Sequence, residues 1–192
     1  AIFCGAHGMA NGLDAVMNAA KVLNERNEQN IKLLFIGDGK LKPQLRELTR
    51  KEQLDNCVFW DPVPKLELSK ITAAAHAGLM ILADVPAFYY GTSPNKFFDY
   101  IASGLPVLTN YPGWLAEVIV KNDCGIAVPP ADPEAFADAL ITLRDDHDRR
   151  RRMGDNARTL AECDFNREKL ADQFVDFLKE TQKNTGNHET PL

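Results

Sequence analysis

Short apolar segments alternate with helical segments along most of the chain, and this alternation restricts the fold more than any other feature. Strand character is found at residues 2–4, 31–36, 58–60, 78–82, 106–109 and 125–128. Apolar residues recur at helical spacing between them, at residues 11–24, 41–50, 66–75 and 95–103 and in a short piece after Gly113. Strands that are apolar throughout must be covered on both faces, and parallel strands need crossover helices. The sequence therefore predicts an α/β fold with a doubly wound, Rossmann-like parallel sheet.

The chain changes character after residue 128. A proline-rich loop precedes a helix at 134–143, and a final helix at 169–178 has an apolar stripe along one side. Arg149 to Arg152 are expected between helices on a solvated surface, and the aspartates beside them are expected in a charge network rather than a metal site. We divide the chain into a domain at 1–166, a terminal helix at 167–184 and a disordered tail at 185–192.

Composition narrows the classes of function. The chain has 192 residues and a net charge of −5, which is enough length for one full core and argues against general binding to nucleic acid or anionic membranes. No apolar run reaches the length of a bilayer span. The four cysteines lack metal-ligand spacing, so we expect reduced thiols, no zinc and a cytoplasmic protein. Because the chain begins inside a strand, we expect it to be a piece of a longer protein.

A candidate anion site lies in the middle of the chain. The turn Gly91-Thr92-Ser93 directly precedes the helix at 95–103, so its N–H groups and the positive end of the helix dipole can bind a phosphate. Lys96 lies in the first turn of this helix, where a cation opposes the dipole, and it is expected to have a partner elsewhere. Asp99 lies one turn further on. A surface pair between Lys96 and Asp99 explains these residues equally well.

Other glycine-rich loops follow the first two strands. Gly5, Gly8 and Gly12 have the position of a dinucleotide fingerprint but not its spacing, and the signatures of P-loop, serine-hydrolase and zinc-protease sites are absent. His7 lies in the first of these loops. It is either a donor to a phosphate or an exposed loop residue.

Several short sequences are specific when they are taken in order. They are GAHGMANGLD at 5–14, FIGDG at 35–39, VFWDPV at 58–63, YGTSPNKFFDYIASGLPV at 90–107, GWLAE at 113–117 and GIAVP at 125–129. On these residues the chain resembles the carboxyl-terminal, nucleotide-sugar-binding domain of a retaining GT-B glycosyltransferase of family 4, often called group 1. The form SPNKFFDY resembles the branch that builds O-antigen and capsule polysaccharides from UDP-activated amino sugars.

The resemblance implies roles for particular residues. The family has two signature acids with seven residues between them; the second corresponds to Asp99, which would bind the ribose, whereas the first is replaced by Gly91. The family's two diphosphate cations are also absent, and Lys96 is the nearest basic residue that could replace them. Glu117 matches an acid near the donor sugar. The implied donor site comprises Gly5, Gly8, Gly91, Thr92, Ser93, Asn95, Lys96 and Asp99, with Glu117 and Lys96 as catalytic residues and no metal.

The resemblance also implies the function of the whole protein. It would transfer a sugar, an N-acetylated amino sugar in this branch, from a UDP-sugar to a lipid-linked or polysaccharide acceptor, without a further cofactor, at the inner face of the membrane. The acceptor would bind an amino-terminal domain outside this chain, so we expect the isolated domain to be inactive. The helix at 167–184 would cross to that domain, and here we expect partial docking and weak self-association. A GT-B epimerase and a non-catalytic sugar-nucleotide-binding module remain alternatives.

Overall fold

Six parallel strands form one sheet in the order β3-β2-β1-β4-β5-β6. The computed structural model describes residues 1–186. The strands are β1 (Ile2–Cys4), β2 (Leu33–Ile36), β3 (Cys57–Trp60), β4 (Gly78–Met80), β5 (Val107–Thr109) and β6 (Gly125–Ala127). The strand order reverses between β1 and β4, which confirms the doubly wound sheet. In such sheets ligands bind at the carboxyl ends of the strands beside this reversal.

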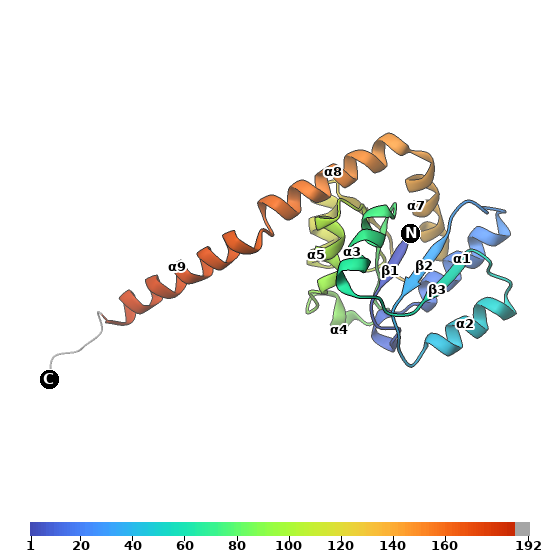
Figure 1. The fold of residues 1–192 in the computed structure, drawn as a ribbon, viewed down its shortest axis with the longest axis horizontal. Coiled ribbons are helices and arrows are strands. Elements are labelled where there is room, and N and C mark those ends of the chain that lie inside the picture. Colours follow the sequence, from blue (N-terminus) through green and yellow to red (C-terminus); the bar gives the residue numbers. More distant parts are fainter. Residues whose placement is uncertain (187–192) are drawn as a thin grey trace.

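Helices cover both faces of the sheet (Figure 1). They are η1 (Met9–Asn11), α1 (Asp14–Glu25), α2 (Lys42–Lys51), α3 (Lys65–Ala74), α4 (Pro86–Tyr89), α5 (Asn95–Ala102), α6 (Trp114–Lys121), α7 (Pro133–Asp145), α8 (His147–Cys163) and α9 (Arg167–Gly186). One core cluster joins α1, α2 and α7 to the sheet, and a second joins α3, α5, α6 and α8 to its other face. The predicted strands, and the predicted helices up to residue 143, are confirmed to within a few residues.

Helix α5 is the helix at whose start the sequence analysis predicted an anion site. Its apolar face buries Phe97, Tyr100 and Ile101, which lie at i, i+3 and i+4. Gly104 follows the helix with φ +68°, a left-handed conformation that ends helices and that glycine adopts without steric cost.

Tyr100 fixes α5 to the sheet. Its hydroxyl accepts a hydrogen bond from the Cys4 N–H of β1 at 3.0 Å, and its ring lies against the first residue of β4. That residue is Gly78, where a Cβ atom would lie 2.4 Å from Cγ of Tyr100. The ring can therefore lie here only because position 78 has no side chain.

The sequence analysis was wrong about the region around residue 150. Arg149 to Arg152 lie inside α8 rather than between helices, and Asp146 caps this helix by accepting a hydrogen bond from the Arg149 N–H. The helix is strongly polar, and only a narrow stripe that includes Met153, Ala157 and Leu160 is buried. So short a stripe is a weak periodic signal.

The carboxyl end of the chain also differs from expectation. Helix α9 extends away from the sheet (Figure 1), and its apolar side chains are exposed, Phe174 at 62%. Partial docking on its own domain is therefore wrong, whereas self-association stays a prediction. Residues 185 and 186, expected in the disordered tail, belong to α9, and the rest of that tail lies outside the described residues. No helix in residues 1–186 is apolar over a stretch long enough to cross a membrane.

The contact between Gly78 and Tyr100 gives a stability prediction. Gly78→Ala should lower the free energy of unfolding by about 1–3 kcal/mol, because the new methyl group must displace the Tyr100 ring. Gly8→Ala is the matched control, since a Cβ there has no atom within 4 Å. Urea unfolding followed by circular dichroism measures both. Equal effects of the two substitutions would contradict the proposed role of Gly78.

Candidate functional site

A cavity of about 510 Å³ lies between α3 and α5, beside the carboxyl end of β1. It is lined by Cys4, Gly5, Lys65, Leu68, Ser69, Thr72, Asn95, Lys96, Asp99, Tyr100, Ala102 and Ser103. Four of the residues predicted from the sequence meet here, namely Gly5, Asn95, Lys96 and Asp99. The position is the one expected for a ligand of a doubly wound sheet.

Lys96 connects α5 to the loop after β1. Its Nζ donates a hydrogen bond to Oδ1 of Asn11 at 2.7 Å and lies 4.2 Å from the centroid of the Phe3 ring. Asn11 in turn donates from Nδ2 to the carbonyl of Ala6 at 2.8 Å. The expected partner of Lys96 is therefore this loop, and the alternative surface pair with Asp99 is wrong.

The surroundings of Lys96 affect its charge. Burial lowers the pKa of Lys96 to about 8, because an ammonium group loses hydration in the cavity. At neutral pH Lys96 is still protonated in most molecules of the protein and carries a positive charge. No carboxylate is paired with Nζ in residues 1–186, so this charge is available to an anion in the cavity.

Asp99 lies on the same wall of the cavity, further along α5. Its Oδ1 is 3.7 Å from Nζ of Lys65 on α3, and its side chain is 52% exposed. A carboxylate this open to solvent can accept hydrogen bonds from ligand hydroxyl groups. No signal in the sequence indicated Lys65, because only the packing of α3 beside α5 brings it to Asp99.

The amino-terminal end of α5 is open. Pro94 occupies the capping position, and no side chain caps the helix. In residues 1–186 the N–H groups of Asn95 and Lys96 have no acceptor, whereas the Phe97 N–H donates to the Pro94 carbonyl at 3.1 Å. Unpaired N–H groups at the start of a helix can bind an anion. Thr92, in the turn before α5, is held by two hydrogen bonds. Its hydroxyl donates to the Phe88 carbonyl, and its own carbonyl accepts from Nε1 of Trp114 at 3.0 Å.

The other predicted site residues do not line the cavity. Gly91 and Ser93 are exposed in the turn, and Gly8 begins η1 with open space around it. Glu117 is exposed on the first turn of α6, the helix whose Trp114 contacts the turn. Their roles stay predictions.

Both interpretations of His7 are wrong. The side chain is completely buried, close to the rings of Phe3, Phe35 and Phe59. Neither ring nitrogen has a hydrogen-bond partner among residues 1–186, and burial lowers the pKa of His7. A neutral imidazole in this position is part of the core.

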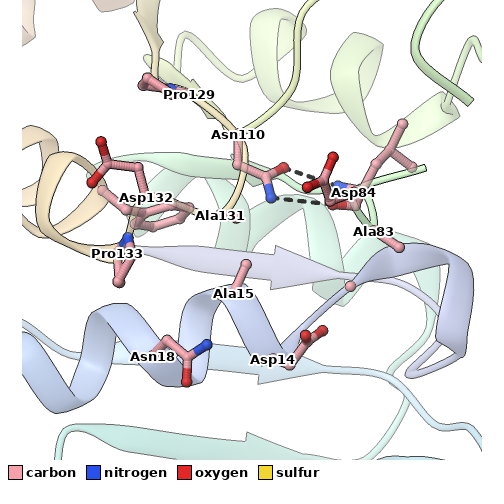
Figure 2. A pocket seen from close by; sticks show the side chains of 13 residues that line it. Asp14, Ala15, Asn18, Ala83, Asp84, Asn110, Pro129, Ala131, Asp132 and Pro133 are labelled. Atoms are coloured by element: carbon pink, nitrogen blue, oxygen red, sulfur yellow. Dashed lines mark hydrogen bonds between the residues drawn. The ribbon is translucent and has the colours of Figure 1, made fainter. Parts of the chain in front are cut away.

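A second, smaller cavity of about 170 Å³ opens at the same edge of the sheet, on its other face. Figure 2 shows Asp14 and Asn18 of α1 on one side and Asp84, Asn110 and Asp132 around the rest. Asn110 is held by two hydrogen bonds of 3.1 Å to the main chain of Leu82. The sequence analysis missed this cavity, although Asp84 and Asn110 follow predicted strands and their position at the carboxyl edge could have indicated it.

In residues 1–186, no three His, Cys, Asp or Glu side chains are grouped to hold a metal ion.

The environment of Lys96 gives a direct prediction. The side chain should titrate near pH 8 in the free protein, followed by NMR of its ε-methylene group and assigned by the loss of that signal in Lys96→Met. Asn11→Leu should lower the pKa further, because the ammonium group loses its acceptor. Titration of Lys96 above pH 10 would contradict this environment.

Comparison with known proteins places the chain in a family. A sequence profile described as "Glycosyl transferases group 1" matches residues 1–146. The chain is 32% identical over 158 residues to a D-inositol 3-phosphate glycosyltransferase of Corynebacterium efficiens, across 76% of this chain and 34% of that protein. It is 26% identical over 161 residues to the N-acetyl-alpha-D-glucosaminyl L-malate synthase of Bacillus anthracis, across 84% of this chain and 40% of that protein.

The fold has close structural neighbours. Anabaena HepE, solved in complex with UDP, matches with a TM-score of 0.78 at 16% identity, over 93% of this chain and 48% of that one. The chain thus spans less than half the length of each of these three proteins. Because the family profile covers residues 1–146 and the sheet has the neighbours' fold, the chain belongs to the group 1 glycosyl transferases and has the fold of the carboxyl-terminal half of a GT-B enzyme.

Proposed function

We propose that the cavity between α3 and α5 binds a UDP-sugar, and that the chain is the donor-binding domain of a retaining glycosyltransferase. The observation that carries this proposal is the position of Lys96. It reaches from the first turn of α5 to the loop after β1 and lines the same cavity as Asp99. A cation and a carboxylate one helical turn apart match the diphosphate and the ribose of one nucleotide.

The lining of the cavity supports one order for the parts of the donor. The diphosphate lies at Gly5, Lys96 and the open end of α5, and the ribose hydroxyls donate to Asp99. The base then extends toward Leu68 of α3, where the wall of the cavity is largely apolar. Gly5 has φ +146° and leaves the phosphates room beside Nζ of Lys96.

Positive charge at the diphosphate is what the reaction requires. When the bond from the sugar to the diphosphate breaks, negative charge develops on the departing UDP. Lys96 and the first N–H groups of α5 stabilise that charge without rearranging, which lowers the barrier more than it strengthens ground-state binding. Glu117, on the helix that contacts the 91–93 turn, then faces the transferred sugar.

The relatives support the finer parts of this proposal. HepE was solved with UDP, and the name of the Bacillus protein specifies an N-acetylglucosaminyl group. We propose an N-acetylated amino sugar as the transferred group, and a lipid-linked or polysaccharide acceptor. The acceptor binds a part of the protein outside this chain, so the isolated domain is inactive.

Binding measurements with two nucleotides test the assignment. Asp99→Ala should weaken uridine and UDP alike by about 1.5 kcal/mol, near the lower limit for a hydrogen bond to a charged group because Asp99 is half exposed. Lys96→Ala should weaken UDP much more than uridine, because only UDP has the diphosphate. UDP affinity should also fall as the pH rises above 8, where free Lys96 loses its charge.

Calorimetry of this chain measures these affinities. Lys70→Ala and Asp172→Ala are the matched controls, since both side chains are exposed and lie away from the cavity. Unchanged UDP affinity in Asp99→Ala would remove Asp99 from the site. Equal losses of uridine and UDP in Lys96→Ala would remove Lys96 from the diphosphate.

The products of the full-length protein distinguish transfer from its alternatives. A lengthened glycan with retained anomeric configuration is expected from a UDP-activated amino sugar and acceptor. Glu117→Gln should lower kcat by about 100-fold and leave UDP affinity unchanged. A free epimerised sugar nucleotide would indicate an epimerase. Binding without turnover would indicate a non-catalytic module, an alternative favoured by Gly91 in place of the first signature acid.

A further inference from the structure

A third cavity, of about 470 Å³, lies at the opposite, amino-terminal edge of the sheet. Helix α8 forms one side, and the segments leading into β4 and β5 form the other. The charged and titratable residues of its lining are His76, His147, Arg150, Arg151, Asp155 and Arg158. The sequence analysis assigned the arginines of this region to a solvated surface. Their place around a cavity suggests a more specific role.

The lining is positively charged although the whole chain is acidic. Three arginines and one aspartate line it, whereas the chain has a net charge of −5, and one of the arginines, Arg158, is paired with Glu162. Arg150 has no carboxylate partner in residues 1–186; its Nη1 donates to the carbonyls of Leu143 at 2.7 Å and Arg144 at 3.0 Å. Arg151 approaches Asp148 only to 3.9 Å, and its side chain is 76% exposed. The charge of these two guanidinium groups is therefore only partly compensated.

Main-chain contacts hold two of the guanidinium groups in place. Arg150 is bound to the carboxyl end of α7, and Arg158 donates from Nη1 to the carbonyl of Ala102 at the end of α5. Nη2 of both arginines has no hydrogen-bond partner in the part of the chain that the structure describes. Donors that are fixed and unused bind an anion without losing further side-chain freedom.

Two histidines complete the cavity. The imidazoles of His76 and His147 make no hydrogen bond to any residue in 1–186. Burial lowers the pKa of His76, and the charge of Arg150 lowers it further. A group whose protonation is opposed by a neighbouring cation gains a proton more easily when an anion neutralises that cation.

We propose that this cavity is a second binding site, which takes the phosphoryl group of a small phosphorylated ligand. Several oxygens around one phosphorus can accept from Arg150, Arg151 and Arg158 together, and the planar guanidinium group suits this geometry. The net charge of −5 opposes flat adsorption on an anionic surface, which favours one molecule in the cavity. The site differs from the cavity between α3 and α5, because Ser103 is the only residue in 1–186 that lines both.

Calorimetry with inorganic pyrophosphate tests the proposal. The full chain is used with Lys96→Ala as background, so that binding at the donor cavity is removed. Arg151→Gln should weaken pyrophosphate binding about tenfold, the loss expected for one charged hydrogen bond. Arg149→Gln is the matched control, because it removes the same charge from the same helix but lies outside the cavity lining, and it should change the affinity less than twofold. In NMR titrations, pyrophosphate should raise the pKa of His76.

A second measurement identifies the source of the phosphoryl group. Vesicles of phosphatidylglycerol and phosphatidylcholine are compared in co-sedimentation. Binding to phosphatidylglycerol that Arg151→Gln abolishes and Arg149→Gln preserves assigns the site to a lipid headgroup, whereas binding of pyrophosphate alone assigns it to a soluble ligand. Absence of binding in both measurements, or equal losses in the two variants, overturns the proposal.

Discussion

The contact of Tyr100 with β1 and β4 decides where the candidate site forms. Its hydroxyl accepts from Cys4, and its ring occupies the space that Gly78 leaves at the start of β4. Helix α5 is thereby fixed across the two strands between which the sheet reverses. Lys96 and Asp99 belong to the same helix, so this contact helps to place both of them. Burial of Phe97 and Ile101 holds the same helix against the sheet.

Lys96 shows how one side chain can join separate parts of the site. Lys96 lies in the first turn of α5, where the helix dipole opposes its charge. Its ammonium group nevertheless donates to Asn11 and lies over the ring of Phe3. Burial lowers the pKa of Lys96 to about 8, and no carboxylate in residues 1–186 is paired with its charge. A cation held in this way is stabilised most by an anionic ligand. For this reason we propose that the diphosphate of the donor binds where α5 and the first loop meet.

The two edges of the sheet have different chemistry. At the carboxyl edge, two lysines and a half-exposed carboxylate line a largely apolar cavity between α3 and α5. At the amino edge, the arginines of α8 bind the carboxyl ends of α5 and α7 and still have free donors. Helix α5 borders both cavities, because Ser103 at its end lines each of them. The two cavities therefore meet at the end of the same helix.

The sequence by itself determined the α/β class, the order of the main elements and four of the residues that line the cavity between α3 and α5. These follow from local signals: apolar strands, helical spacing, and a turn before α5. Only the tertiary structure decided the partners. Lys96 is bound to Asn11, 85 positions away in sequence, and Asp99 faces Lys65. Burial of His7 and formation of α8 also depended on packing, because an isolated imidazole and a narrow apolar stripe give no periodic pattern. Contacts between distant segments leave no such pattern in the sequence, so only the folded chain specifies them.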